Sequence, residues 1–185
     1  MHFLAGILIV VLTIIIIWLI SSFNLFIKGK NLIAEAWSGI DVQLKRRYDL
    51  IPNLVESVKG YSQHERKLYE DIANIRSQAI STQGVLEKGQ IETALTQQLR
   101  SLIAVSERYP DLKANQNFLE LQKSLTNIED EIQLARRYYN GTVRDFNIRV
   151  ESFPSNIIAM IFVFKRADFF EIEVATQREA PTVKL

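Results

Sequence analysis

The stretch FLAGILIVVLTIIIIWLISSFNLFI, residues 3–27, decides the fold, because it holds no charged side chain while all 22 basic and 21 acidic residues of the chain lie after it. As an α-helix rising about 1.5 Å per residue it would measure about 38 Å, more than the roughly 30 Å hydrocarbon core of a bilayer. We therefore predict one membrane-spanning helix at residues 3–27, with the lipid bilayer as its partner.

A cleaved secretory signal is the alternative interpretation of this stretch. Such a signal has a basic n-region, a short apolar centre and a small-residue cleavage site. Here only Met1 and His2 precede the apolar residues, the stretch is longer than a signal core, and the sequence Ser-Ser-Phe-Asn at 21–24 contains no Ala-x-Ala pattern. The sequence therefore favours an uncleaved anchor.

The charges that flank the stretch predict its orientation. Lys28, Lys30 and the Lys-Arg-Arg cluster at 45–47 follow it, and no Lys or Arg precedes it. Basic residues near a span tend to stay on the cytoplasmic side. We expect a single-pass protein with a cytoplasmic body and a very short outer N-terminus.

Composition narrows the chemistry of the rest of the chain. The remainder is nearly neutral and has no basic face for nucleic acid, and the absence of cysteine excludes disulfides, thiolate metal sites and a cysteine nucleophile. His64, the only histidine outside the terminus, lies in a helix-capping sequence, and nucleotide-binding and hydrolase motifs are missing. We predict no catalytic residue, metal or cofactor, and no enzyme.

The first soluble helix is expected at residues 30–61, continuous with the span or separate from it. Pro52 interrupts its apolar pattern, which resumes in phase at Val55, so we expect a kink rather than an end. Pro52 is the candidate hinge; a tolerated bend is the simpler interpretation. The apolar face of this helix consists of Ile33, Trp37, Ile40, Leu44, Tyr48, Ile51, Val55 and Val58.

Two shorter helices are expected next. Ser62-Gln-His-Glu65 matches a capping box, so a helix should begin near Gln63 and end near Ser81. The glycines that follow predict a loop at 82–90, and a further helix should run over 90–108 until Tyr-Pro-Asp at 109–111. The inner faces are Leu68, Ile72, Ile75 and Ala79, then Ile91, Leu95, Leu99, Leu102 and Val105.

The longest soluble helix is expected at 115–151, with apolar residues spaced as a coiled-coil heptad. After Tyr139 two steps of four follow each other, so the packing partner or the supercoil should change there. Asn140-Gly141 is a turn signal, but the continuing apolar pattern favours an unbroken, locally weakened helix. Asn140 also begins a formal glycosylation sequon, which a cytoplasmic location would leave unused.

The C-terminal part carries more apolar surface than a short segment can bury alone. Phe153-Pro154 should end the long helix, and the apolar run 157–164 is too short to cross a bilayer. It packs on the bundle, on a neighbouring copy, or at the membrane surface with its two basic residues toward lipid headgroups. The candidate interaction residues are Phe153, Ile157, Ile158, Phe162, Phe164, Lys165, Arg166, Phe169 and Phe170.

Several stretches together resemble the LemA family of bacterial membrane-anchored helical proteins. They are EAWSGIDVQLKRRYDLIPNLV at 35–55, YPDLKAN at 109–115, YN at 139–140, VRD at 143–145 and ESFPSN at 151–156. The resemblance implies an N-terminal anchor with an elongated antiparallel helical bundle, a bacterial source, and no established activity or catalytic residues to carry over.

The expected fold is therefore all-α, a transmembrane helix followed by an elongated antiparallel bundle of about four long helices. We divide the chain into an anchor at 1–29, a LemA-like bundle at 30–175 and a short tail at 176–185. The leading hypothesis is a non-enzymatic scaffold in the bacterial inner membrane that forms a homo-oligomer or binds an unknown protein partner. The alternative is a membrane-surface or envelope-stress factor whose aromatic C-terminal segment contacts lipid.

Overall fold

The computed structural model describes residues 2–62 and 64–171, and within these residues every regular element is a helix. The six helices are α1 (His2–Lys59), α2 (Arg66–Ser81), α3 (Val85–Ser106), α4 (Pro110–Lys113), α5 (Gln116–Glu151) and α6 (Ser155–Ile161). The all-helical prediction is confirmed, whereas the finer expectation of a four-helix bundle stays a prediction. The proposed tail at 176–185 lies outside the described residues.

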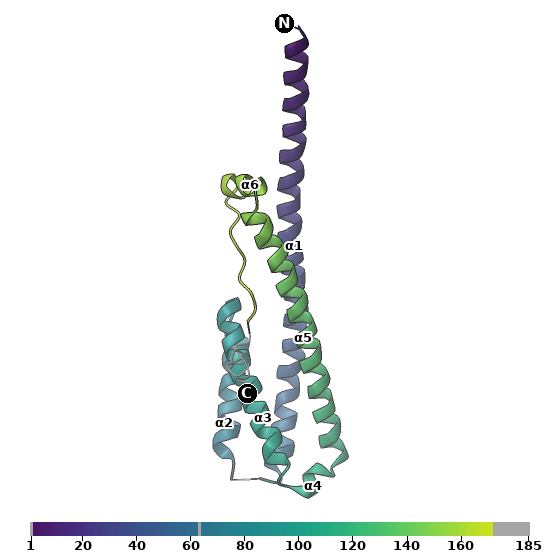
Figure 1. The fold of residues 1–185 in the computed structure, drawn as a ribbon. Coiled ribbons are helices and arrows are strands. Elements are labelled where there is room, and N and C mark those ends of the chain that lie inside the picture. Colours follow the sequence, from purple (N-terminus) through teal and green to yellow (C-terminus); the bar gives the residue numbers. More distant parts are fainter. Residues whose placement is uncertain (1, 63, 172–185) are drawn as a thin grey trace, which may run out of the picture.

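Helix α1 joins the apolar stretch to the bundle without a break. It has 58 residues and would measure about 87 Å, and its N-terminal part stands clear of every other element in Figure 1. The most apolar 18-residue window of α1 has no buried residue, and this is the helix of the described chain that is long and apolar enough to cross a membrane. From Trp18 onward, α1 packs against other parts of the protein.

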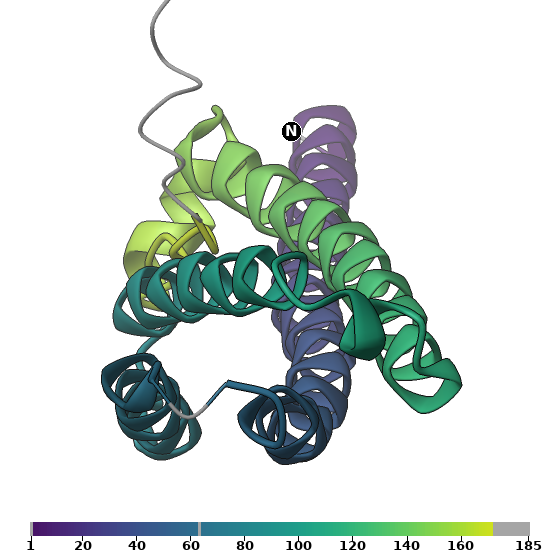
Figure 2. The same ribbon diagram turned by 90° about the horizontal axis from the view of Figure 1, so that it is seen from below.

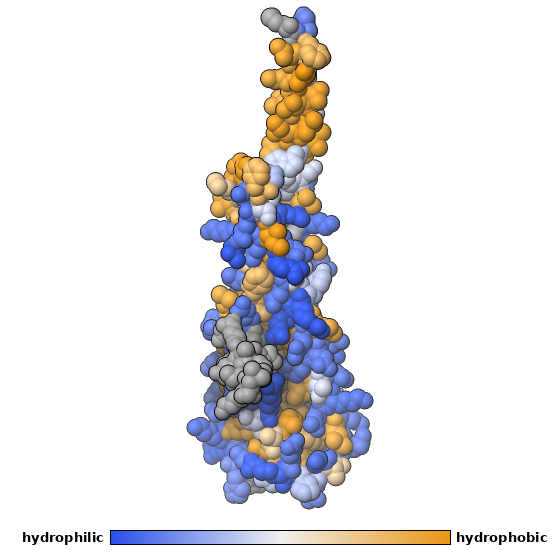
Figure 3. Space-filling model, viewed as in Figure 1, coloured by the Kyte–Doolittle hydropathy of each residue, from blue (hydrophilic) through white to orange (hydrophobic). Residues whose placement is uncertain are grey.

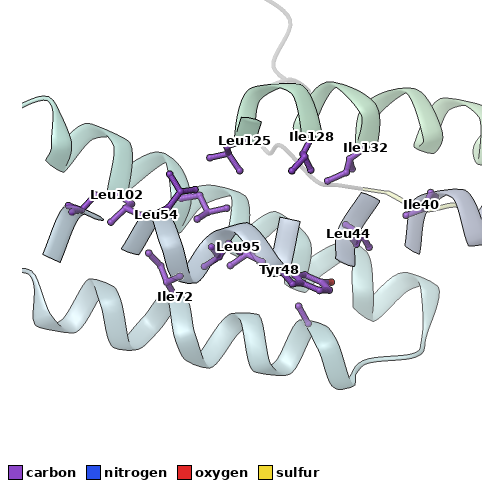
Figure 4. Close-up of a cluster of buried hydrophobic side chains, with 14 of the residues drawn as sticks. Ile40, Leu44, Tyr48, Leu54, Ile72, Leu95, Leu102, Leu125, Ile128 and Ile132 are labelled. Atoms are coloured by element: carbon purple, nitrogen blue, oxygen red, sulfur yellow. The ribbon is translucent and has the colours of Figure 1, made fainter. Parts of the chain in front are cut away.

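The bundle consists of two helix pairs, α1 with α5 and α2 with α3, and the second pair packs against α1. Helix α5 lies along α1, α2 packs against α3, and both α2 and α3 contact α1 (Figures 1 and 2). Leucine and isoleucine side chains from all four helices meet in the core, which Figure 4 shows in close-up. The predicted inner faces are confirmed: Ile40, Leu44, Ile72, Leu95 and Leu102 are fully buried.

Pro52 lies inside α1, and the helix continues beyond it to Lys59. Proline has no N–H, so the carbonyl oxygen of Tyr48, four residues earlier, lacks its helical donor. Arg76 of α2 replaces that donor, with its Nε 2.7 Å from the Tyr48 oxygen. A side chain of the neighbouring helix thus satisfies the backbone gap that Pro52 creates.

The predicted capping box at 62–65 is wrong. Helix α2 begins at Arg66, and Glu65 at its N-cap makes no side-chain capping bond. Ser62 is buried instead, where its hydroxyl accepts a hydrogen bond from Tyr109 and its carbonyl accepts one from Tyr69. Tertiary contacts to two tyrosines therefore take the groups that the box would have used.

The predicted loop at 82–90 is too long, because α3 begins at Val85 instead of residue 90. Gly89 is helical and buried, and a Cβ at this position would collide with the carbonyl oxygen of Glu171. This glycine allows another part of the chain to approach closely; it does not form a turn.

Helix α5 follows the prediction closely. Asn115 caps it by accepting a hydrogen bond from the Phe118 amide, and it runs through Asn140-Gly141 to Glu151. Its apolar seam passes from the main core, which includes Val143, to a second cluster that includes Phe146. The packing partner thus changes within the stretch where the spacing of apolar residues shifts.

Candidate membrane-facing site

The second cluster lies where α1 leaves the bundle, and we call it the membrane-proximal cluster. Its buried members are Phe26 of α1, Phe146 of α5, and Ile158 and Ala159 of α6. Three residues from the apolar stretch of α1 pack against it, namely Trp18, Leu19 and Phe23. Helix α6 therefore packs directly on the end of the apolar stretch.

Aromatic rings hold this attachment together. The rings of Phe164 and Phe26 stack with centroids 4.7 Å apart, and Phe146 meets Phe26 edge-on at 6.0 Å. The centroids of Phe162 and Phe23 are also 4.7 Å apart. Each such pair adds about 0.5–1.5 kcal/mol beyond the area it buries, so α6 and the segment after it are firmly placed on α1.

A set of large apolar side chains on and beside α6 points away from the protein. We define this α6 apolar face as Phe153, Ile157, Met160, Ile161, Phe162 and Val163, with exposed fractions between 44% and 80%. In Figure 3 hydrophobic surface at the height of α6 lies next to the uniformly hydrophobic free part of α1, with mostly hydrophilic surface below. A face of this kind typically meets lipid or another protein.

The position of α6 along α1 would coincide with the edge of a bilayer that the apolar stretch spans. A hydrocarbon core of about 30 Å takes about 20 helical residues, so a core that begins near Phe3 ends near Ser22. The side chains that contact the membrane-proximal cluster, Trp18, Leu19 and Phe23, lie at that end. In a bilayer placed over residues 3–22, the α6 apolar face would lie at the depth where acyl chains give way to headgroups.

The structure divides the candidate interaction residues into two groups. Ile158 and Phe170 are fully buried in the chain's own core, and Phe164 and Phe169 are half-buried. The others are exposed, and Arg166 forms an ion pair with Glu151 at 2.9 Å. The exposed group consists of Phe153, Ile157, Phe162, Lys165 and Arg166.

After α6 the chain is extended and runs back along α5 to the main core; we call residues 164–171 the strap. Asn147 donates to the Ala167 carbonyl at 2.9 Å and accepts from the Ala167 amide at 2.8 Å. Asn140 holds Phe170 in the same way, at 3.1 and 2.9 Å. The two asparagines are two helical turns apart on α5, and their side-chain amides replace the backbone partners that a strand would have.

The strap ends in the main core. Phe170 is fully buried, its ring meets that of Trp37 edge-on with centroids 5.5 Å apart, and it contacts the position of Gly89. The Tyr139 hydroxyl donates to the Asp168 carbonyl at 2.9 Å, and burial raises the pKa of Tyr139. The roles of Asn140 and Asn147 were not predicted from the sequence. Their spacing of seven residues, beside the apolar seam of α5, is the pattern that could have indicated them.

A model of the LemA family matches residues 36–185, which include most of the bundle, α6 and the strap. The chain belongs to the LemA family. It is 28% identical over 165 residues to the protein LemA of Metamycoplasma hominis, covering 83% of this chain and 73% of that protein.

This LemA-family chain is also similar to magnetosome proteins. It is 24% identical to magnetosome protein MamQ 2 of Paramagnetospirillum magneticum, over 83% of this chain and 66% of that protein. It is 21% identical to magnetosome protein MamQ of Magnetospirillum gryphiswaldense, over 82% of this chain and 65% of that protein. The chain spans just under two thirds of the length of these MamQ relatives. Family membership and these relatives fit a non-enzymatic, membrane-associated protein.

The LemA-family core also contains an ionic cluster. Arg47 of α1 is 1% exposed and contacts Glu92 of α3, which is fully buried. Arg47 also reaches Thr96 at 3.0 Å and Glu129 of α5 at 2.8 Å. The cluster thus joins three helices at one level, and the Arg47–Glu92 pair within it is buried.

Two further groups complete this cluster. The Tyr48 hydroxyl donates to Glu92, and burial raises the pKa of Tyr48 to about 12. Lys88 lies 5.7 Å from the centre of the Tyr48 ring, and burial lowers its pKa. Arg47, one residue of the basic cluster at 45–47, is thus paired between helices. Within residues 2–62 and 64–171 no set of side chains has the arrangement of a metal site.

Proposed function

We propose that this protein is a non-enzymatic scaffold that stands on a bilayer, anchored by α1 and seated at the membrane surface by the α6 apolar face. One observation carries the proposal: α1 is unbroken from the unburied apolar stretch into the bundle core, and α6 packs at the end of that stretch. Whatever depth α1 takes in a bilayer, α6 must take the neighbouring depth.

The α6 apolar face suits the interfacial region energetically. Met160 and Val163 are 79% and 70% exposed, so water would hydrate them in the absence of lipid. Moving apolar side-chain area out of water contributes roughly 25 cal/mol per Å², and amphipathic helices bind the interface in this way. Lys165 and Arg166 are exposed beside this face, where headgroup phosphates would meet them.

The test is a depth measurement on the full chain. Because the sequence has no cysteine, Met160→Cys gives one labelling site on the α6 apolar face, and Ser77→Cys on the exposed side of α2 is the matched control. A fluorophore at 160 should be quenched by brominated lipids in reconstituted vesicles, and one at 77 should not. Equal, weak quenching at both sites would contradict the seating of α6.

Self-association is the second candidate function, and the outer face of α5 favours it. Leu134, Tyr138 and Ile148 are all more than half exposed and fall along one helical stripe. A second copy that packs on this stripe would bury them. The mass of the detergent-solubilised protein, compared with that of Leu134→Lys, tests this idea, since a strict monomer for the unmodified chain contradicts it.

The proposed location is the bacterial inner membrane with the bundle in the cytoplasm, supported by Lys28 and Lys30 immediately after the span. The same Ser77→Cys variant tests the orientation in intact cells. A membrane-impermeant maleimide should leave residue 77 unlabelled until the membrane is opened, and immediate labelling would reverse the assignment.

A further inference from the structure

A hollow of about 250 Å³ lies between α1 and α5, just below the apolar stretch. We call it the headgroup pocket; it is lined by Leu25, Lys28, Gly29, Leu32, Thr142, Asp145, Phe146 and Arg149. From these residues we infer that the pocket binds the phosphate of an anionic phospholipid from the adjoining leaflet. This inference rests on the proposed seating of the protein in a bilayer and names the lipid group that it binds.

The pocket lies at the depth of the headgroups. Counting from Ser22, where the hydrocarbon core ends, Leu25 and Gly29 are about 5 and 10 Å further along α1. The headgroup layer on each side of a bilayer is about 5–8 Å thick. Lys28 lies about 9 Å beyond Ser22, just outside that layer, and helical side chains lean toward the N-terminal end of their helix, so its ammonium group can reach the level of the lipid phosphates.

Two cations from different helices line the pocket. Neither Lys28 nor Arg149 takes part in any ion pair found among residues 2–62 and 64–171. Asp145, the one carboxylate of the lining, is 69% exposed and contacts Arg144 at 3.2 Å. The pocket therefore retains a net positive charge for an anion.

The remaining lining favours a lipid over a free ion. Leu25 is 45% exposed, and together with Leu32 and Phe146 it provides an apolar wall beside the cations. The Thr142 hydroxyl donates to the Tyr139 carbonyl at 2.7 Å, so the two cations carry the recognition of the phosphate. A phosphodiester with the start of an acyl chain matches both parts of the lining.

Gly29 permits this geometry. A Cβ at position 29 would lie 2.8 Å from Cδ2 of Phe146, so a larger residue would displace the Phe146 ring that lies between α1 and α5. With glycine the helices approach closely enough for Lys28 and Arg149 to border one hollow. The volume equals that of roughly eight water molecules at about 30 Å³ each, which accommodates a phosphate with part of the glycerol.

The test uses the full chain in a neutral detergent, with native mass spectrometry to count lipids retained during titration with phosphatidylglycerol or phosphatidylcholine. The unmodified protein should retain phosphatidylglycerol more tightly. The double variant Lys28→Gln with Arg149→Gln should weaken the binding of phosphatidylglycerol about 30-fold, because each surface cation contributes about 1 kcal/mol. Its binding of phosphatidylcholine should be unchanged. Lys30→Gln with Lys45→Gln removes two exposed positive charges outside the pocket and should change little.

Three results would overturn the inference: no preference for phosphatidylglycerol, equal loss in both double variants, or displacement of the lipid by millimolar inorganic phosphate, which would indicate a simple anion site. Helical content at 222 nm shows whether each variant is folded. The outcome is separable from the proposed seating of α6, because lipid retention in detergent does not depend on the quenching of a label at residue 160.

Discussion

Replacing Arg76 with methionine tests how the bundle accommodates Pro52. The substitution keeps the apolar stem but removes the Nε that lies 2.7 Å from the Tyr48 carbonyl oxygen. That oxygen has no other donor from its own helix, because residue 52 lacks an N–H. Arg76→Met therefore leaves a partly buried acceptor without its partner.

A hydrogen bond from a charged donor is worth about 1.5–3 kcal/mol, and the half-exposed position of Arg76 lowers the expected loss to about 1–2 kcal/mol. Pro52→Ala restores an amide four residues after Tyr48. In that background Arg76→Met should cost less than about 0.5 kcal/mol, so the double-mutant cycle should give a coupling energy of about 1 kcal/mol.

The four proteins are compared by thermal unfolding in lipid nanodiscs, followed at 222 nm and by tryptophan fluorescence. The expected loss lowers Tm by about 3–8 °C for a bundle of this size. Arg66→Met is the control, because Arg66 is 87% exposed and its ion pair with Glu70 should contribute less than about 1 kcal/mol. Equal costs of Arg76→Met with and without Pro52 would refute the reasoning.

Three further outcomes are expected. Glu92→Leu should destabilise the bundle by about 3–5 kcal/mol, since it leaves the buried Arg47 with Glu129 alone; a thermal shift no larger than that of an exposed substitution would contradict this. Asn140→Ala removes both hydrogen bonds to Phe170, so the Phe170 amide should exchange with deuterium faster by tenfold or more, and unchanged exchange would mean that the strap is held elsewhere. Between pH 10 and about 12 the unfolded chain loses the Tyr48 proton while the folded chain retains it, so the free energy of unfolding should fall with rising pH by up to about 3 kcal/mol. The lowered pKa of Lys88 acts in the opposite direction up to pH 10.5. Chemical unfolding should therefore show a flatter pH dependence for Tyr48→Phe than for the unmodified protein.

Local and periodic signals predicted the long elements well. The boundaries of α5 could be predicted from the sequence, because Asn115 caps its first turn and Phe153-Pro154 follows its end. The apolar pattern also predicted correctly that α5 continues through Gly141. A Cβ at that position would have no neighbour within 4 Å, so the packing around it does not require a glycine.

The errors arise where distant residues override a local pattern. Ser62 resembles the first residue of a capping box, yet Tyr69 and Tyr109 take its hydrogen-bonding groups. Gly89 resembles a turn residue, but the strap passes over it and requires a small side chain. The strap could not be predicted from a periodic pattern of residues. Its backbone groups bond to side chains of α5 and not to a neighbouring strand.

The apolar seam of α1 contained a clue that periodicity alone did not interpret. Arg47 lies three residues after Leu44 and four before Ile51, which places a cation on the buried face. Glu92 occupies the matching position three residues before Leu95. A cation and an acid at buried positions on two helices predict a pair, although only the fold shows that Glu129 joins them.

With α1 spanning a bilayer as proposed, its continuity would make the protein a lever with its pivot in the bilayer. From Ser22 to Lys59 the helix extends about 55 Å beyond the hydrocarbon core. A thinner membrane tilts a long span, and a tilt near the average of about 20° would carry the far end of the bundle about 19 Å sideways and bring it closer to the surface. Membrane thickness, which depends on the lipid mixture, would thereby set how far the α2–α3 end lies from the membrane surface.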